Sequence, residues 1–527
     1  TRSLETPEPN RLGVSEAHYP QNVQKEVDIL FVVDNSGSMR THQQNLVRNF
    51  PKLIEALRSE KLGGRIPNVR IGVVSSDAGT IVPVGGCTAT GDDGMLQRRR
   101  PEDKSAASCP LPTNAWISYD ADKNITNVPS TTEHDCDSDP IGCVKQAFSC
   151  MAELGTDGCG IEASLESAAR ALDGRNEGFL REKALLAVVF ITDEDDCSVK
   201  SPGLFQDPDN KSKQLGPLGY RCFAHGFDCD IVDPQMIGPR EECKPNDDYL
   251  KSVSHYVSTF EALKKDPGQL IFAAISGPSS PIEVARTIAG DPHLEPSCRI
   301  DVIDDTTGRK AGGAPALRLN AVVEALDGQL TAICESDFGP ALKTLGHKIV
   351  VSLGGQCVRK PLRLQNGGFA CHEGVEGCRM PSCGDGRCDQ STGHCLDAKG
   401  APTEAYCGAT CLDKVECTVD EHRGLGDEKQ VVAIERCPRE FFLDASLPKD
   451  ACGEHCPCWR IVPRGEQCTS AGASPFGFEV MRKGDAPPNT VASARCSVSP
   501  VPWTDPSITG AAAHCVAPDD AQGNVGG

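Results

Sequence analysis

Twenty-eight cysteines in a chain of 527 residues are the feature that most constrains how this sequence can fold. Both parts of the chain contain an even number of them: twelve lie before about residue 355 and sixteen lie after it. Cysteines this numerous and irregularly spaced are typical of disulfide-bonded proteins in an oxidising compartment. Even totals on each side are what two separately disulfide-bonded regions would give. We therefore expect an extracellular or cell-surface protein with intramolecular disulfides.

Metal binding by thiolates is the alternative use of these cysteines. Its best candidate is the segment CGEHCPCW, which contains Cys452, Cys456 and Cys458. Structural zinc sites usually combine two closely spaced cysteine pairs, and no paired CxxC spacing of that kind supports this segment. The sequence favours disulfides over zinc.

Charge and hydropathy exclude several classes of partner. The chain has 53 Lys and Arg residues against 74 Asp and Glu residues, a formal net charge of −21. This charge argues against nucleic acid or anionic lipid as a main partner. No segment approaches the roughly 20 consecutive apolar residues that a transmembrane helix needs. The polar first residues, TRSLETPEPN, suit a tether of a secreted protein whose leader has been removed, or one with a lipid anchor upstream.

Strand and helix patterns alternate over the first 350 residues. The segment at 27–34 is a continuous apolar run, the pattern of a strand buried on both faces. The segment after it repeats apolar residues at helical spacing, at Leu46, Phe50 and Leu53, although Pro51 interrupts it. Strands alternating with helices predict an α/β fold, a doubly wound, mostly parallel sheet. The predicted strands are 27–34, 68–76, 184–193 and 269–277, and the predicted helices are 45–57, 161–174, 249–265 and 337–350.

Long segments rich in Cys, Pro, Gly and Asp interrupt this pattern near 79–150, 195–245 and 278–315. Loops this long are uncommon unless they are functional, and each contains cysteines, so we expect disulfide-stapled insertions. After Gly355 the helical periodicity is lost. The expected division is an N-terminal tether (1–24), the α/β domain with its insertions (25–353), a cysteine-rich loop region (354–429), and a small disulfide-bonded β module with a tail (430–527).

The segment DNSGS, at the end of the first predicted strand, places a carboxylate and two hydroxyls at alternate positions. Ligands of doubly wound sheets bind beyond the carboxyl ends of the strands, so Asp34, Ser36 and Ser38 are candidate ligands. The loop LGTDGCG offers Thr156, and Asp193 follows the third predicted strand. Carboxylate and hydroxyl oxygens suit Mg²⁺, Mn²⁺ or Ca²⁺ and not zinc or copper. We therefore predict a site for one divalent cation.

Together, Asp34-x-Ser36-x-Ser38, Thr156 and Asp193 resemble the metal-ion-dependent adhesion site of von Willebrand factor A domains. In that family the corresponding side chains surround one divalent cation, directly or through water, and a carboxylate of the partner often completes the octahedron. DxSxS alone is a common pattern. Its place after an apolar strand, with the other two elements in the same order, makes the resemblance specific.

The resemblance covers roughly residues 25–353, with longer insertions than a minimal family member has. It implies a secreted or cell-surface adhesion protein that binds a protein or extracellular-matrix ligand, through a carboxylate, at a bound Mg²⁺ ion, with Ca²⁺ or Mn²⁺ as alternatives. The rival is a structural component of an extracellular or envelope assembly in which the metal only stabilises the fold. More loosely, VVSSDAGT and CWRIV resemble segments of cysteine-rich surface or lipoprotein-type proteins from bacteria such as the myxobacteria.

The candidate ligands also have other roles open to them. Asp34 and the two serines could form a helix-capping turn, because Asp and Ser favour helix starts. Asp157 competes with Thr156 as the ligand from the loop. The acidic residues at 194–196 are expected to form a solvated rim, with a second, weaker calcium site as the alternative.

Catalysis is not expected. A metal-activated hydrolase needs a general base beside the ion, commonly His or Glu, and the nearest histidine in sequence is His42, eight residues after Asp34. The sequence contains no HExxH or GxSxG motif and no convincing Ser/His/Asp set. An intracellular chelatase or ATPase-partner role fits poorly with 28 cysteines.

Overall fold

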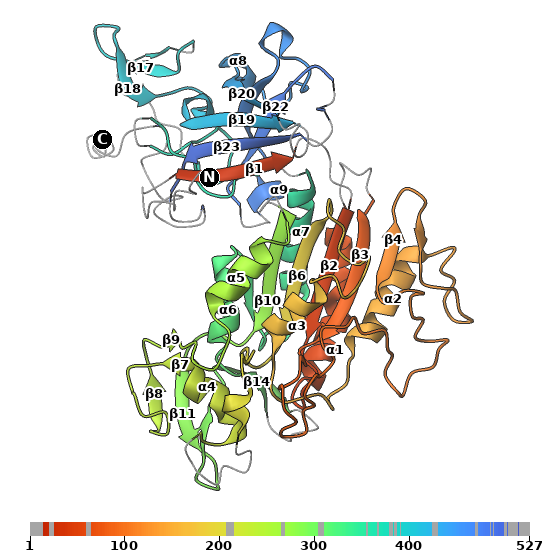
Figure 1. Cartoon of the computed structure of the whole chain (residues 1–527). Helices are drawn as coiled ribbons and strands as arrows, with labels where there is room; N and C mark the ends of the chain where they lie inside the picture. The colour runs from red at the N-terminus through yellow and green to blue at the C-terminus, as the bar shows by residue number, and fades with distance from the viewer. Residues whose placement is uncertain are drawn as a thin grey trace. The chain divides into compact units, whose positions relative to one another are not determined.

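The chain divides into two compact units (Figure 1). The larger unit is Lys25–Ile349, and the smaller combines Thr1–Gln24 with Val350–Gly527. The computed structural model describes residues 14–20, 26–58, 65–206, 215–264, 269–303, 310–354, 357–365, 368–378, 383, 387–389, 391–423, 430–469, 473–484, 486–487, 490–499, 503 and 515.

A seven-stranded sheet forms the centre of the larger unit, in the order β15-β10-β6-β2-β3-β4-β5. Neighbours from β15 to β3 pair in parallel, whereas β4 and β5 are antiparallel. The four predicted apolar strands are all present, as β2, β3, β6 and β10. The bounds are β2 (Glu26–Val33), β3 (Asn68–Ser75), β4 (Ile117–Asp120), β5 (Ile125–Thr126), β6 (Leu185–Ile191), β10 (Leu270–Ser276) and β15 (Gln329–Ala332).

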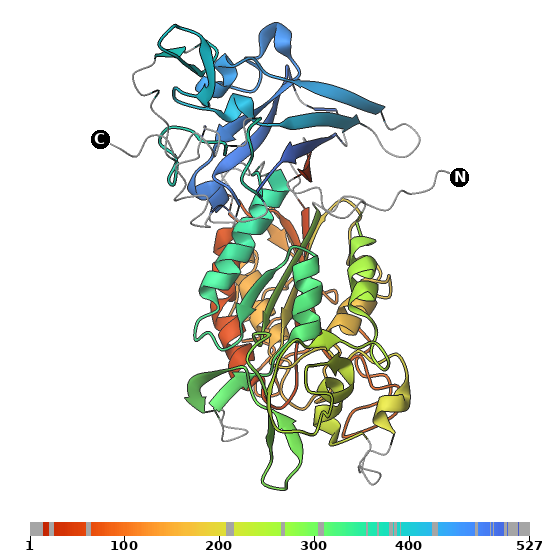
Figure 2. The same ribbon diagram turned by 90° about the vertical axis from the view of Figure 1, so that its left-hand side faces the viewer.

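Helices cover this sheet (Figure 2). On one face Phe31 of β2 packs against Phe50 of α1 and Phe148 of α2, with ring centroids 6.0 and 4.7 Å away. On the opposite face Leu30 and Val32 share a core with α3, α5 and α6. The bounds are α1 (Arg40–Ala56, with Pro51 inside it), α2 (Pro140–Ala152), α3 (Ser164–Ala171), α5 (Val253–Glu261), α6 (Leu317–Ala325) and α7 (Gly339–Gly354).

The segments predicted as insertions contain short strands that form sheets of their own. β8, β11 and β12 make a three-stranded antiparallel sheet, β13 pairs with β14, and β7 pairs with β9. The bounds are α4 (Arg221–Gly226), β7 (Phe227–Asp228), β8 (Gly238–Arg240), β9 (Lys244–Pro245), β11 (Ile282–Arg286), β12 (Pro292–Leu294), β13 (Cys298–Ile303) and β14 (Lys310–Gly313).

The predicted fold class, an α/β doubly wound, mostly parallel sheet, is wrong for this chain. The described strands are divided among six sheets; the two largest mix parallel and antiparallel pairing and the other four are antiparallel. Buried parallel strands are continuous apolar runs that a sequence shows plainly. Short strands in cysteine-, glycine- and proline-rich segments give no such signal, so the prediction missed them. The structure is mixed and rich in disulfides.

The smaller unit is built on a six-stranded sheet, β1-β23-β19-β20-β21-β22. Residues 14–20, expected in a tether, instead form β1 and pair with β23 along seven residues. Tyr19 explains this, because its ring stacks on Phe478 at 4.4 Å in the core. The other residues of the expected tether, 1–13 and 21–24, lie outside the described residues. The bounds are β1 (Val14–Pro20), β19 (Cys417–Arg423), β20 (Gln430–Arg436), β21 (Cys458–Pro463), β22 (Phe476–Met481) and β23 (Val491–Ser497).

The predicted cysteine-rich loop region and β module are not separate, because β19 of the first pairs with β20 and β23 of the second. The loop region also contributes a small antiparallel sheet. The remaining bounds are β16 (Cys388–Asp389), β17 (His394–Leu396), β18 (Pro402–Tyr406), α8 (Glu440–Leu443) and α9 (Glu466–Thr469).

All 28 cysteines are paired, in fourteen disulfides, which confirms the prediction from composition. Six join cysteines before residue 355 and eight join cysteines after it, so no disulfide joins the two parts of the chain.

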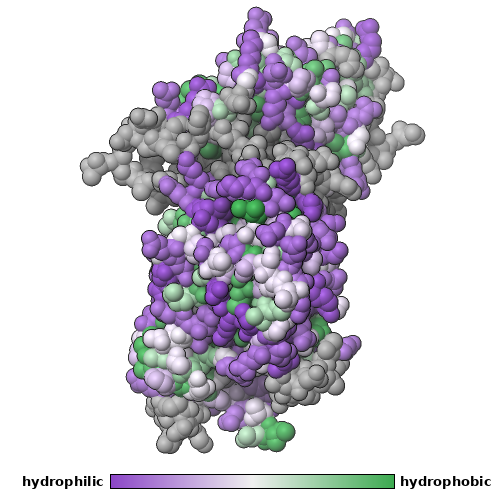
Figure 3. Space-filling view, turned by 90° about the vertical axis from the view of Figure 1, so that its right-hand side faces the viewer, coloured by the Kyte–Doolittle hydropathy of each residue, from purple (hydrophilic) through white to green (hydrophobic). Residues whose placement is uncertain are grey.

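Hydrophilic side chains predominate on the face shown in Figure 3. Within the described residues, no helix combines the length and the apolar character that crossing a membrane requires.

Candidate metal centre

Three neighbouring parallel strands end side by side at one edge of the seven-stranded sheet. β2 is in register with β3 and with β6 along its length. Asp34, Ser76 and Thr192 therefore leave the sheet at the same level, and Asp193 follows Thr192. Two partly buried loops lead away from this edge: the 34–38 segment enters α1, and residues 155–163 (the 155–163 loop) enter α3.

Asp34 is fully buried and is held by donors from two segments. Its Oδ1 accepts a hydrogen bond from the Ser36 N–H at 2.7 Å, and its Oδ2 accepts one from the Thr192 hydroxyl at 2.8 Å. Gln43 of α1 donates through Nε2 to the carbonyls of Asp34 (2.8 Å) and Gly155 (2.9 Å). Gln43 thereby joins the 34–38 segment to the 155–163 loop.

The two serines of the motif lie next to each other. The Ser36 and Ser38 hydroxyl oxygens are 3.3 Å apart. Ser36 is buried and Ser38 is half-buried. Burial raises the pKa of Asp193, and a hydrogen bond from Ser38 opposes that rise, so the motif and the end of β6 are in direct contact. The structure thus brings together Asp34, Ser36, Ser38 and Asp193, four of the five predicted ligands.

Thr156, the fifth predicted ligand, lies on the 155–163 loop and is half-buried, whereas Asp157 is exposed. The loop is fixed to the motif through its backbone, because the Gly158 N–H donates to the Asn35 carbonyl at 2.9 Å. Within the described part of the chain, no hydrogen bond joins the Thr156 side chain to the other four predicted ligands.

A third buried carboxylate, Glu162, belongs to this cluster and was not predicted. Its Oε2 accepts a hydrogen bond from the Ser76 hydroxyl, and its carboxyl group lies near that of Asp34. Only 1% of Glu162 is exposed. The one sequence signal was an acidic residue at the start of an amphipathic pattern, which ordinarily indicates a first helical turn.

The carboxyl groups of this cluster repel one another. Burial raises the pKa of Glu162 and Asp193 well above the ordinary values, and the charges of Asp34 and Glu194 raise both further. Burial also raises the pKa of Asp34, in spite of its hydrogen bonds to Ser36 and Thr192. Burial and mutual repulsion thus disfavour the charged form of these carboxyl groups, and a bound cation would favour it.

Several oxygens at this site lack partners. Among the described residues, no donor reaches Asp193 Oδ1, Glu162 Oε1 or Asn35 Oδ1, all on side chains at least nine-tenths buried. None of the ion pairs between described residues includes Asp34, Glu162 or Asp193. Buried charges are ordinarily paired or coordinate metals. The donor set therefore fits a hard divalent cation.

The spacing of these groups limits how a cation could be held. In the described residues, the only three Cys, His, Asp or Glu ligand atoms within 4.8 Å of one another belong to Cys383, Cys388 and Cys407. The carboxylate oxygens of Asp34, Glu162 and Asp193 therefore do not all lie within 4.8 Å of one another, and these three side chains alone would not hold a cation. The residues present suit a mixed set of carboxylates, hydroxyls and waters.

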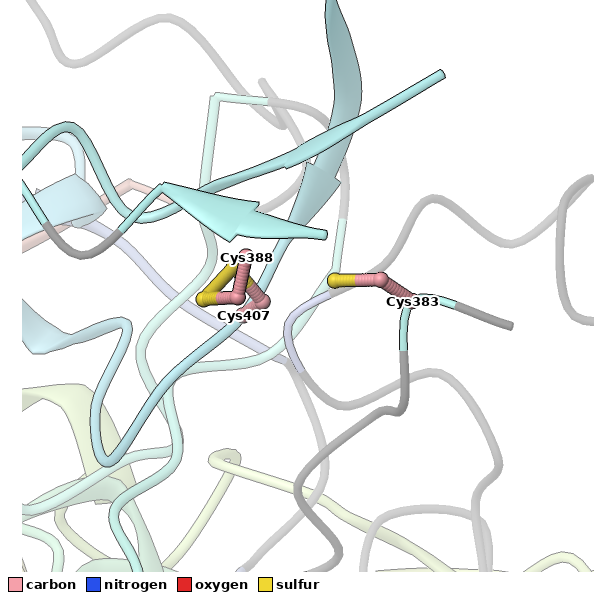
Figure 4. Close-up of side chains that lie close together, drawn as sticks. All are labelled: Cys383, Cys388 and Cys407. Carbon is pink, nitrogen blue, oxygen red and sulfur yellow. A yellow bond between two sulfur atoms is a disulfide. The ribbon is translucent and has the colours of Figure 1, made fainter. Parts of the chain in front are cut away.

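The three clustered cysteines are not a metal site. Figure 4 shows Cys388 bonded to Cys407 with Cys383 nearby, and Cys383 is bonded to Cys395. Disulfide sulfurs are not thiolates, and thiolates are what soft metals bind. The same holds for the CGEHCPCW segment, whose three cysteines form disulfides as Cys452–Cys456 and Cys437–Cys458.

The acidic residues after Asp193 correct another expectation. Asp195 accepts hydrogen bonds from the first N–H groups of α6, at Leu317 (2.9 Å) and Arg318 (3.0 Å). The buried Asp196 accepts one from the Leu165 N–H of α3, at 2.9 Å. Both cap helix N-termini, where carboxylates are favourable. They therefore tie the end of β6 to two helices, and of the three acids expected to form a solvated rim only Glu194 is exposed.

No protein-family model matches the sequence, and no curated protein matches it either. Among solved structures, the pilus adhesin SpaC from Lactobacillus rhamnosus GG, in an open conformation, matches with a TM-score of 0.26 and 9% identity, covering 92% of this chain and 41% of that chain. The adhesive tip pilin GBS104 from Group B Streptococcus agalactiae matches with a TM-score of 0.24 and 8% identity, covering 92% and 81%. The chain spans less than half the length of SpaC. Similarity this low carries no argument about fold or function.

Proposed function

We propose that the protein is a secreted or cell-surface binding protein that engages its partner through a divalent cation. The cation is held between the 34–38 segment, Asp193 and the 155–163 loop, as in the adhesion site that these residues resemble. The fourteen disulfides support the oxidising location. The observation that carries the proposal is the buried cluster of three carboxyl groups, Asp34, Glu162 and Asp193, in which Glu162 Oε1 and Asp193 Oδ1 have no donor among the described residues.

Each part of the site has a role in this proposal. Asp34 and Asp193 supply charge, while Ser36 and Ser38 supply neutral oxygens that leave much of the ion's charge unbalanced. The bound ion supplies a Lewis-acidic position that an oxygen of a partner, such as a carboxylate, can occupy. Thr192 and Gln43 hold the Asp34 carboxylate and backbone in place.

Access from solvent supports binding over a purely structural ion. Gly37 and Asp157 are exposed, and Ser38 and Thr156 are half-buried. The rim of the site therefore reaches solvent while the acids lie beneath it. A partner could approach the ion from this side.

A structural ion is the second candidate, and Glu162 is the observation that favours it. A third carboxylate would neutralise a divalent ion more completely and would weaken its attraction for a partner's carboxylate. In that case the ion would stabilise the fold and leave no coordination position to exchange.

Mn²⁺ separates the two candidates, because it is paramagnetic and reports on exchangeable water. We would load chelator-treated protein with Mn²⁺, measure water proton relaxation, and titrate acetate as a carboxylate probe. A binding site predicts enhanced relaxation that acetate reduces, and loss of both effects in Asp34→Ala but not in the exposed Asp122→Ala. Bound Mn²⁺ without exchangeable water would establish the structural candidate. Failure to bind Mn²⁺ would refute both.

A further inference from the structure

A small apolar cluster lies beside the candidate metal centre, distinct from the main core of the sheet. We name it the satellite core. It contains two disulfides, Cys87–Cys159 and Cys197–Cys222, with Cα separations of 4.7 and 5.5 Å. The satellite core consists of Val84, Cys87, Cys159, Ile161, Cys197, Leu204, Phe205 and Leu250, with Val82, Val199, Leu218, Cys222 and Tyr249 packed against it.

The satellite core holds the segment that carries Glu162. Cys159 and Ile161 are both buried in it, immediately before Glu162. The Cys197 N–H donates to the Glu162 carbonyl at 2.6 Å, so one backbone hydrogen bond joins the segment after Cys159 to Cys197. Cys197 also lies four residues after Asp193.

The other side of the same segment faces the ends of the strands. The Ala163 N–H donates to the Ser76 carbonyl, and the Gly158 N–H donates to the Asn35 carbonyl, both at 2.9 Å. The segment from Gly158 to Ala163 is thus fixed on one side to β2 and β3 and on the other to the satellite core. The acids repel one another, so this attachment opposes their separation.

We infer that the Cys87–Cys159 and Cys197–Cys222 disulfides are positioning groups of the metal centre, which hold Glu162 and Asp193 in place for the cation. The inference rests on the proposed function. Because coupling between two equilibria is reciprocal, a bound cation must in turn favour the oxidised form of these two disulfides. Groups that orient metal ligands typically change metal affinity by about 10- to 100-fold when removed.

The first test uses the intact wild-type chain. We would treat it with dithiothreitol in the presence of either EDTA or saturating Ca²⁺, alkylate the released thiols at intervals, and quantify each cysteine by mass spectrometry. The control is Cys136–Cys143, whose two cysteines are buried as Cys87 and Cys159 are, and whose Cys143 lies in the first turn of α2. Ca²⁺ should slow the reduction of the two satellite-core disulfides several-fold and leave the control unchanged. Equal protection of all three disulfides, or of none, would overturn the inference.

A second test measures metal affinity directly by calorimetric titration of Ca²⁺. Cys87→Ser/Cys159→Ser and Cys197→Ser/Cys222→Ser should each bind about 10-fold or more weakly, and Cys136→Ser/Cys143→Ser should bind as the wild type does. Wild-type affinity in both satellite-core variants would overturn the inference while leaving the proposed function intact. Absence of Ca²⁺, Mg²⁺ and Mn²⁺ binding by the wild type would instead refute the proposed function. If a variant does not fold, the reduction experiment decides.

Discussion

The Thr192 hydroxyl at the end of β6 donates a hydrogen bond to Asp34 Oδ2 at the end of β2, over 2.8 Å. The two residues are 158 positions apart in sequence, and both are buried. This bond fixes the orientation of the carboxylate that begins the DNSGS segment. Because β2 and β6 are in register, their ends lie at the same level, and the Thr192 hydroxyl therefore lies within reach of the Asp34 carboxylate.

Removing the Thr192 hydroxyl should weaken the binding of the divalent cation, because the Asp34 carboxylate would lose the donor that orients it. We expect Thr192→Val to lower divalent-cation affinity by about 10- to 100-fold and to destabilise the fold by about 1–3 kcal/mol. The measurements are calorimetric titration and urea unfolding. Thr192→Ser keeps the hydroxyl and should retain the affinity; equal affinities in the Val and Ser variants would show that the bond does not orient a ligand.

Gly158 and Gly160 form a matched pair for testing the 155–163 loop. A Cβ atom at Gly158 would lie 2.3 Å from Asn35 side-chain atoms, whereas one at Gly160 would have no heavy atom within 4 Å. Gly158→Ala should therefore displace the loop from the 34–38 segment and weaken cation binding, and Gly160→Ala should leave it unchanged. Titration of Ca²⁺ into both variants checks this. If Gly158→Ala bound Ca²⁺ as tightly as the wild type, the 155–163 loop would not contribute to the site.

Substitution of Asp195 or Asp196 should lower the stability of the fold and leave the number of bound calcium ions unchanged. Each caps a helix, so Asp195→Ala and Asp196→Ala should destabilise the fold by about 0.5–2 kcal/mol. Urea unfolding in the presence of EDTA measures this. A calcium titration that loses one of two equivalents, without a change in the unfolding free energy, would instead establish the second calcium site that the sequence left open.

The 155–163 loop offers three candidate ligands, and their exposure ranks them. Glu162 is buried with a free oxygen, Thr156 is half-buried and Asp157 is exposed. We expect Glu162→Gln to weaken cation binding most, Thr156→Ala to weaken it less, and Asp157→Ala to leave it unchanged. Affinities measured by titration under one buffer condition give the order. Loss of binding in Asp157→Ala alone would reverse this assignment.

Part of the site could be predicted because its residues follow features that a sequence displays. Asp34 comes directly after a continuous apolar run and Asp193 one residue after another, and the parallel strand pattern places the ends of such runs at one edge. The spacing of Ser36 and Ser38 then identified the segment. The four apolar strands were found for the same reason.

The rest depended on contacts between residues far apart in sequence. Glu162 joins the cluster through Ser76, 86 residues away, and its position at a helix start resembles ordinary capping. Tyr19 reaches Phe478 across almost the whole chain, so the β1–β23 ladder left no local pattern. The short strands of the insertions are ordered by disulfides and turns, and their periodicity is too brief to detect. The fold class was wrong for that reason.

The proposed function depends on Asp34 as a ligand of the divalent cation. Calorimetric titration of Mg²⁺, Ca²⁺ and Mn²⁺ into chelator-treated wild-type protein, beside Asp34→Ala and the exposed control Asp122→Ala, tests it most directly. We expect saturable binding at one site in the wild type and in Asp122→Ala, and its loss in Asp34→Ala. Absence of binding in the wild type, or equal binding in Asp34→Ala, would refute a role of Asp34 as a ligand and leave DNSGS as a hydrogen-bonded turn.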